Sequence, residues 1–163
     1  MYTPMKLKRY QIRENAFMLL FESLFSQEEP EEILLLAEES GALEVTPEVR
    51  DLFLKTCEKK SEIDKNIAEN LSNKWSIARI SKISLSILRV AVYELCYEKG
   101  LAVSFVINEA VELGKAYSTP EDAAFINGVL GAVSRRLSRT EACAAESRKD
   151  TEAGEETAKT HLE

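Results

Sequence analysis

The chain has 163 residues, which fits one compact domain or two small halves that share a core. Its net charge of −7 argues against a generic nucleic-acid-binding protein, which would usually be basic. The mainly aliphatic apolar residues, with only six glycines and four prolines, favour an all-α protein. Three cysteines without a CxxC pair indicate reduced thiols. The absence of an apolar run of about 18 residues and of a signal-peptide pattern predicts a cytoplasmic protein.

The first predicted helix covers residues 9–25 and follows a short basic lead. Its inward stripe is Ile12, Ala16, Leu19, Leu20 and Leu24. Phe17, Phe21 and Phe25 form an adjoining stripe at i, i+4 spacing. Because the combined apolar surface is unusually broad, we expect a partner to cover part of it, although all three rings would also suit the core.

Four cations, Lys6, Lys8, Arg9 and Arg13, precede the first acidic residue, Glu14. Lys6, Arg9 and Arg13 would line one helix face at i, i+3 and i+7 if the helix begins early. Arginine forks match the geometry of phosphate, so this face is a candidate RNA-binding surface. The alternative is a solvated helix start, where basic charge opposes the helix dipole.

The next segments carry clear helix-end signals. Pro30 predicts the start of a second helix that stops at Ser40-Gly41. Thr46 and Pro47 predict the cap and first residue of a third helix, whose period continues to residue 71 with a possible kink near residues 60–61.

Three apolar segments in residues 75–131 organise the rest: residues 83–97, 104–116 and 123–137. Each has helical spacing, and the short loops between them favour antiparallel packing. We expect a helix at 83–98 capped by Ser81 or Ser84, a helix capped by Ser104, and a last helix from about residue 121 to 139.

Asn108, Asn127 and Gly128 interrupt these apolar helices. Because a buried amide must be hydrogen-bonded, we expect the two asparagines to lock one helix to another. Gly128 would let a neighbouring helix approach closely. Residues 140–163 form an acidic tail almost free of large apolar residues, which predicts disorder.

No enzyme site, cofactor site or metal site is predicted. The single histidine, His161, lies in the tail, and the chain has neither GxxxxGK nor GxGxxG. The pair Glu109 and Glu112 fits a solvated helix face better than a metal site, since no second helix offers a matching Glu-x-x-His.

Four sequence motifs, in the same order along the chain, resemble those of a known protein family. W-S-x-x-R-I-x-x-I-S at 75–84, I-L-R-V-A-V-Y-E-L at 87–95, I-N-E-A-V-E-L-G-K at 107–115 and F-I-N-G-V-L at 125–130 resemble the NusB family of bacterial transcription antitermination factors. The resemblance covers about residues 9–137.

The resemblance implies an all-α fold of about seven helices in two packed three-helix bundles, within an RNA-binding, non-enzymatic domain at residues 1–139. Family members pair with NusE, a small-subunit ribosomal protein, bind boxA RNA in nascent transcripts, notably of rRNA operons, and join the RNA polymerase elongation complex. The arginine-rich start of the family's first helix contacts RNA. Arg9 and Arg13 match it here, whereas Tyr10 and Gln11 stand where arginines are common.

The resemblance also makes Phe125, which opens the F-x-N-G motif, a candidate for stacking on a base. The competing hypothesis is a helical scaffold or homodimer without an RNA role, motivated by the net acidity and by the broad stripe of Phe17, Phe21 and Phe25.

Overall fold

The structure is a computed structural model that describes residues 7–159, with the side chains of residues 7–149. Within these residues it contains seven α-helices, one short 3-10 helix and no strand: α1 (Arg9–Ser23), α2 (Pro30–Ser40), α3 (Pro47–Glu58), α4 (Lys60–Glu69), η1 (Ile77–Arg79), α5 (Lys82–Tyr97), α6 (Val103–Tyr117) and α7 (Pro120–Lys159). The predicted all-α class is confirmed.

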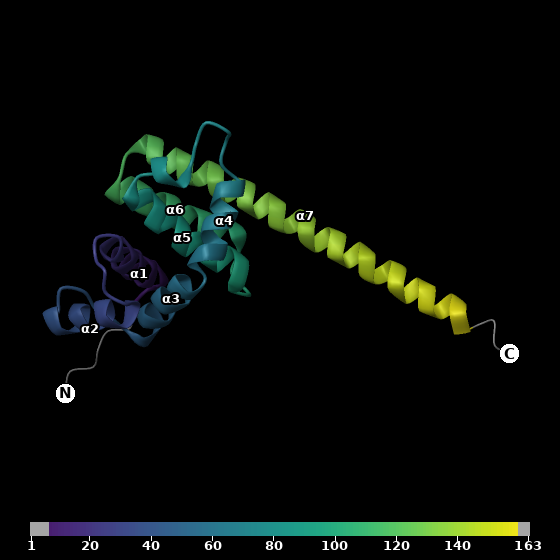
Figure 1. The fold of residues 1–163 in the computed structure, drawn as a ribbon, viewed down its shortest axis with the longest axis horizontal. Coiled ribbons are helices and arrows are strands. Elements are labelled where there is room, and N and C mark those ends of the chain that lie inside the picture. Colours follow the sequence, from purple (N-terminus) through teal and green to yellow (C-terminus); the bar gives the residue numbers. More distant parts are fainter. Residues whose placement is uncertain (1–6, 160–163) are drawn as a thin grey trace.

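The helices form two groups of three, joined by α4 (Figure 1). Helices α1, α2 and α3 contact one another, as do α5, α6 and α7, while α1 and α3 also pack on α5. Every residue of α5 from Ser84 to Glu94 is buried. A helix that is covered all round lies at the centre of a fold, and α5 is therefore the element on which both bundles are assembled.

The predicted ends of α2 and α3 are confirmed. Gly41 closes α2 in the left-handed conformation, with φ of 64°. The Thr46 hydroxyl caps α3 by accepting a hydrogen bond from the Val49 backbone N–H at 3.3 Å, and Pro47 is the first helical residue. The interruption expected near residue 60 falls at Lys59, which separates α3 from α4.

The starts of α5 and α6 differ in their caps. Ser81 caps α5, since its hydroxyl accepts from the Ser84 backbone N–H at 3.2 Å. The prediction that Ser104 caps α6 is wrong: α6 begins at Val103 after Ala102, and no side chain caps it. The first buried residue of α6 is Val106, one turn further on.

The expected structural asparagines are not buried. Asn108 and Asn127 are both exposed, and neither side chain hydrogen-bonds to another of the residues whose side chains are described. The prediction that these amides lock helices together is therefore wrong. Each lies on the outer face of a helix whose apolar neighbours face inward, so its amide is available to solvent or to a ligand.

Gly114, rather than Gly128, permits close helix packing. A Cβ atom added at Gly128 would meet nothing within 4 Å, so the predicted close approach there is wrong. A Cβ atom at Gly114 would lie 3.0 Å from Ile126 Cδ1 and 3.2 Å from Ala123 Cα. The glycine that α6 needs in order to pack against α7 is thus in the I-N-E-A-V-E-L-G-K motif.

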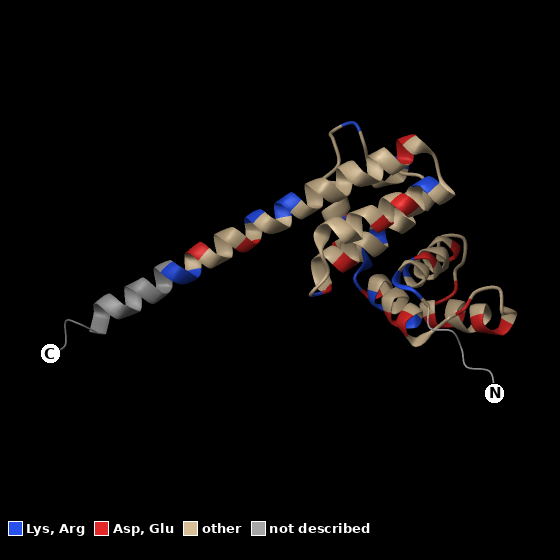
Figure 2. Ribbon diagram, turned by 180° about the vertical axis from the view of Figure 1, so that it is seen from behind, with Lys and Arg blue, Asp and Glu red and all other residues tan. Residues whose placement is uncertain are grey.

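Helix α7 continues well past residue 139 and projects away from the body (Figure 1). Leu137 is the last of its residues that packs on the core, and the side chains of 138–149 are exposed. The structure thus has helix at 140–159, where the sequence predicts disorder. The segment is rich in Ala, Glu, Lys and Arg, which continue a helix already begun. Acidic and basic residues both lie along its first part, up to residue 149 (Figure 2). No helix among the described residues is long and apolar enough to cross a membrane.

Candidate nucleic-acid interface

The first turn of α1 presents two of the four predicted RNA-binding cations. Lys8 and Arg9 are exposed, and neither forms an ion pair with a described carboxylate. The first turn holds no acidic residue, so the positive end of the helix dipole adds to these two charges. Cations beside free backbone N–H groups form a site for an anion such as phosphate. Lys6 lies outside the described residues.

Arg9 also faces acidic neighbours. It lines a hollow of about 400 Å³ between α1, α3 and the end of α5, together with Glu48, Asp51 and Glu98. None of these carboxylates lies within ion-pair distance of Arg9, yet they reduce its pull on a distant anion. Attraction from this end of α1 is therefore short in range.

Arg13 is not part of this surface, which corrects the prediction from spacing. Its residue is 3% exposed. Its Nε and Nη2 atoms donate hydrogen bonds to the two carboxylate oxygens of Glu94 at 2.6 and 2.8 Å. Its Nη1 atom lies 4.0 Å from Glu109 Oε2, and its guanidinium sits 4.9 Å from the centre of the Phe105 ring. Arg13 therefore ties α1 to α5 and α6, and is not available to phosphate.

A second group of aromatic and basic residues gathers near the other end of α1. The rings of Trp75 and Phe125 lie 5.4 Å apart with a 38° tilt, which joins the connector before η1 to the first turns of α7. Trp75 is 48% exposed and Phe125 is half-buried. Two neighbouring rings, one exposed and one partly exposed, offer a surface on which bases can stack.

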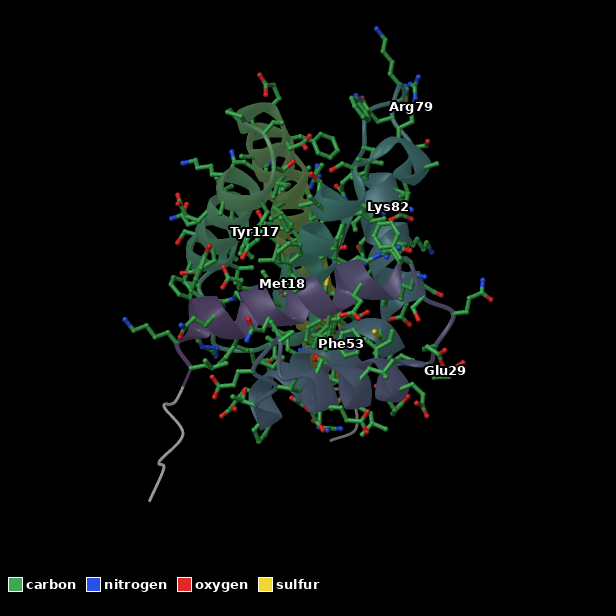
Figure 3. All side chains as sticks on the ribbon, turned by 90° about the vertical axis from the view of Figure 1, so that its left-hand side faces the viewer. Met18, Glu29, Phe53, Arg79, Lys82 and Tyr117 are labelled. Carbon is green, nitrogen blue, oxygen red and sulfur yellow. The ribbon has the colours of Figure 1, made fainter. Side chains whose placement is uncertain are left out.

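One cation, Arg79, lines a hollow with this aromatic pair, and a second, Lys82, lies beside Phe25. Arg79 and Lys82 project from the same side of the molecule, above the end of α1 that leads to Glu29 (Figure 3). The Arg79 Nη1 atom donates to the Lys74 carbonyl at 2.7 Å, which fixes the connector. Neither Arg79 nor Lys82 forms an ion pair with a carboxylate in the part of the chain that the structure describes. Lys82 Nζ instead lies 4.4 Å from the centre of the exposed Phe25 ring.

Sequence reasoning identified Phe125 in this group but missed Trp75, Arg79 and Lys82. The available signal was the only tryptophan of the chain, placed in a polar connector with basic residues on both sides. We call Trp75, Arg79, Lys82 and Phe125 the aromatic–basic face.

Two hollows flank the Trp75–Phe125 pair. One, of about 240 Å³, lies between the end of α4 and α7. The other, of about 220 Å³, lies between η1, the start of α5 and the start of α7, and we call it the Ser84 hollow; its lining is Trp75, Arg79, Ile80, Ser81, Ser84, Glu121, Asp122 and Phe125.

The three phenylalanines of the first predicted helix separate into core and surface. Phe17 is 2% exposed and meets the Tyr117 ring edge-on at 5.1 Å, so its assignment to a partner surface is wrong. Burial, followed by the hydrogen bond that the Tyr117 hydroxyl donates to Glu14 at 2.9 Å, raises the pKa of Tyr117 to about 12. Phe21 is half-buried, and Phe25 is 64% exposed. Of these three rings, Phe21 and Phe25, at and just after the C-terminal end of α1, offer apolar surface to a partner.

The described side chains contain no group of three His, Cys, Asp or Glu residues that could hold a metal ion. Cys57 and Cys96 are half-buried and free, and burial raises the pKa of the Cys57 thiol to about 11. A thiol with a raised pKa is a poor nucleophile at neutral pH, so these cysteines fit a packing role.

Comparison with known proteins decides the family. The model of the NusB family matches residues 10–135. The chain belongs to the NusB family. Among curated relatives, the transcription antitermination protein NusB of Clostridium botulinum (strain Kyoto / Type A2) is 40% identical over 141 residues, covering 77% of this chain and 98% of the relative. That of Clostridium novyi (strain NT) is 38% identical over 130 residues, covering 77% and 96%.

Solved NusB structures share the fold. NusB of T. maritima superposes with a TM-score of 0.71 at 33% identity, over 80% of this chain and 93% of that one. A crystal structure of the antitermination factors NusB and NusE in complex with dsRNA matches with a TM-score of 0.69 at 27% identity, over 78% and 96%. The predicted family is thereby confirmed, as is the expectation of a transcription factor rather than an enzyme.

Proposed function

We propose that this NusB-family chain is a transcription antitermination factor, which acts in the cytoplasm with NusE, binds boxA RNA in nascent transcripts, notably of rRNA operons, and joins the RNA polymerase elongation complex. The observation that carries the proposal is the likeness, over 78% of the chain, to NusB solved with NusE and dsRNA. The RNA-binding domain is residues 1–139.

Two surfaces of the chain support RNA contact. Lys8 and Arg9 offer two unpaired charges at the positive end of α1, with Lys6 beyond the described residues. The aromatic–basic face supplies rings for stacking and cations for phosphates at the other end. Phosphate contacts hold the strand, whereas stacked bases demand that it be single-stranded.

The charge distribution supports a requirement for the partner. The chain carries −7 overall, and carboxylates line the hollow beside Arg9. We therefore expect weak binding of RNA by the chain alone and tighter binding with NusE. Phe21 in α1 and Phe25, two residues after its end, are in edge contact at 5.1 Å, and we assign both to a protein partner.

The test is the salt dependence of boxA RNA binding, with and without NusE. A single-stranded RNA loses about 0.7 in the slope of log affinity against log salt for each phosphate contact removed. The double variant Lys8→Glu/Arg9→Glu should therefore lower the slope by about 1.4. Acidic residues in a first turn favour the helix, so this loss cannot come from an unfolded α1.

A charge-matched control is the double variant Lys60→Glu/Lys65→Glu on α4, where both lysines are exposed and without an ion pair among the described residues. It should retain most of the wild-type slope. Equal slopes for the wild type and the Lys8/Arg9 variant would remove the start of α1 from the RNA surface. Failure to bind RNA even with NusE would overturn the proposed function.

The alternative, a helical scaffold or homodimer without RNA binding, is supported by exposed apolar side chains on α2 and α6: Leu35, Leu36, Val103 and Phe105. Light scattering separates the two. A dimer that persists in the presence of NusE and RNA would favour the scaffold, whereas a dimer that dissociates when the partner binds is compatible with antitermination.

A further inference from the structure

We propose that the outer side of α2 is a docking site for a cationic amphipathic helix of a protein partner. We call Glu31, Glu32, Leu35, Leu36 and Glu39 the α2 face, and all five residues are exposed. The inference goes beyond the proposed function, because this face shares no residue with either set of RNA contacts and does not require RNA. It rests on two uncovered leucines and on the charge of the side chains around them.

The apolar residues of α2 divide between the core and the surface. Ile33 and Leu34 are 2% and 0% exposed, whereas Leu35 and Leu36 are 47% and 50% exposed. With 3.6 residues per turn, Leu35 lies on the side of α2 opposite to its buried residues, and Leu36 lies next to that side. Single exposed apolar side chains are ordinary on a protein surface. Two adjacent ones on an 11-residue helix instead form a patch that a partner can cover.

Glutamates flank both leucines at helical spacing. Glu31 and Glu39 lie four residues before and four residues after Leu35. Glu32 and Glu39 lie four before and three after Leu36. Residues at this spacing are neighbours on one helix face. None of the three carboxylates forms an ion pair with a described residue, so the apolar patch has an unneutralised acidic border.

Part of this charge lies where the helix itself disfavours it. Glu38 and Glu39 are in the last turn of α2, at the negative end of the helix dipole, and that turn contains no basic residue. Glu38 pairs with Arg50, but Glu39 has no such partner among the described residues. The chain has no lysine, arginine or histidine from residue 14 to residue 49. A cation from another molecule would relieve this unfavourable charge.

The charge of the α2 face selects the class of occupant. Figure 2 shows acidic residues and no basic residue on α2, so RNA and anionic membranes are repelled. A second copy that docked through the same face would oppose glutamate with glutamate. A helix with an apolar stripe between rows of lysine or arginine is complementary, because its stripe covers Leu35 and Leu36 while its cations meet the glutamates. Since α2 is about 16 Å long, about three turns of the partner helix would cover it.

The test uses a labelled peptide of about 18 leucines and lysines, whose leucines share one helix face. Fluorescence anisotropy, with the full chain as titrant at about 50 mM salt, measures its affinity. One control peptide has the same composition, but its leucines are spread around the helix. A second has glutamate in place of lysine. We expect the cationic amphipathic peptide to bind at least about tenfold more tightly than the first control, and the second control not to bind.

Variants of the α2 face test the two parts of the surface separately. Leu35→Ser/Leu36→Ser should weaken binding of the cationic amphipathic peptide at least about tenfold, because the apolar area that the peptide covers is lost. Glu32→Gln/Glu39→Gln should weaken binding about threefold to tenfold and should reduce its salt dependence. All four positions are exposed, so circular dichroism should show an unchanged helix content.

Matched controls change the same kinds of residue elsewhere on the chain. Val103→Ser removes an apolar side chain of α6 that is 47% exposed. Glu141→Gln/Glu146→Gln removes two exposed charges of α7 that have no ion pair with a described residue. Both controls should leave the affinity within about twofold of the wild type.

The outcomes separate this docking site from the proposed function. Equal affinity for the two lysine peptides would overturn the docking site, as would unchanged binding by the Leu35/Leu36 variant. The titration is repeated with the chain saturated by NusE, which we assign to Phe21 and Phe25. The peptide should bind equally well there, and its exclusion by NusE would overturn a separate site on α2. None of these results alters RNA binding with NusE, which tests the proposed function.

Discussion

Replacing Arg13 should destabilise the fold rather than simply weaken RNA binding. The Arg13 guanidinium donates two hydrogen bonds, of 2.6 and 2.8 Å, to the Glu94 carboxylate, and its Nη1 atom lies 4.0 Å from Glu109 Oε2. The side chains of Arg13 and Glu94 are 4% and 5% exposed. Arg13→Ala would leave two neighbouring carboxylates without their cation, one of them fully inside the protein.

The cost can be bounded. Removing one partner of a buried ion pair costs about 3–5 kcal/mol, because the remaining charge stays buried and unpaired. A domain of this size has about 5–15 kcal/mol of stability, so Arg13→Ala should remove a large share. Urea denaturation followed by helical circular dichroism measures the change, and the midpoint of thermal unfolding should fall by roughly 6 °C or more.

Arg9→Ala is the matched control, since Arg9 is exposed four residues earlier on the same helix and has no ion pair among the described residues. Its effect should stay within about 0.5 kcal/mol. The double variant Arg13→Leu/Glu94→Leu should lose much less stability than Arg13→Ala, because apolar replacement of both partners is often neutral. If Arg13→Ala costs no more than Arg9→Ala, the structural role assigned to Arg13 is refuted.

Other parts of the fold give three further predictions. Gly114→Ala should cost about 1–3 kcal/mol through overpacking against α7, whereas Gly128→Ala, with open space around it, should be neutral or stabilise α7 by up to about 1 kcal/mol; urea titrations of both decide this. The Glu62 carboxylate, which accepts a hydrogen bond from Tyr97, raises the pKa of Tyr97 to about 12, and burial adds to the shift. The folded state therefore holds this proton more tightly than the unfolded state. The contribution of the Tyr97 hydroxyl to the free energy of unfolding is fully present below about pH 10 and is lost toward pH 12; Tyr97→Phe should flatten that decline in denaturation experiments at a series of pH values. Deleting residues 140–163 should change the free energy of unfolding by less than about 0.5 kcal/mol, since the described side chains of that segment are exposed; a larger loss would show that the segment packs on the body.

Helix ends were predictable where they depend on local backbone chemistry. Pro30, Thr46-Pro47 and Gly41 act through fixed φ, a side-chain cap and a left-handed conformation, none of which requires a tertiary partner. Ser104 failed as a cap because α6 begins one residue before it, after Ala102, which has no side-chain acceptor. A serine near the start of an apolar segment therefore does not by itself identify the first helical residue.

The polar residues within apolar motifs were harder to place. A period of 3.6 predicts which side chains share a face, but not whether a residue at the edge of that face is covered. Asn127 and Gly128 lie just outside the covered stripe of α7, and Gly114 lies inside that of α6. Such edges are determined by interhelical distance, which the sequence of one helix does not specify.

Arg13 shows the same difficulty at the candidate site. Its spacing from Arg9 predicts a shared face, but Ala16, Phe17 and Leu20 follow it at i+3, i+4 and i+7 and are all buried. Glu94, near the end of the long apolar run of α5, was the signal that a cation must enter the core, because a buried carboxylate needs a partner. Pairing complementary charges across helices would have separated Arg13 from Lys8 and Arg9.

Because Arg13 is buried, the proposed RNA contacts fall into two sets at opposite ends of α1: Lys8 and Arg9 at the start, and the aromatic–basic face near the end. The helix has 15 residues and is about 22 Å long, which is about twice the screening length of roughly 10 Å at 0.1 M salt. Each set therefore acts on its own stretch of phosphates, and neither can attract RNA over the net negative charge of the rest of the chain. A strand that has engaged one end meets the other at high effective concentration. An RNA too short to reach both ends gains nothing from this effect, so a partner that holds the strand along α1 would convert two weak contacts into one stable complex.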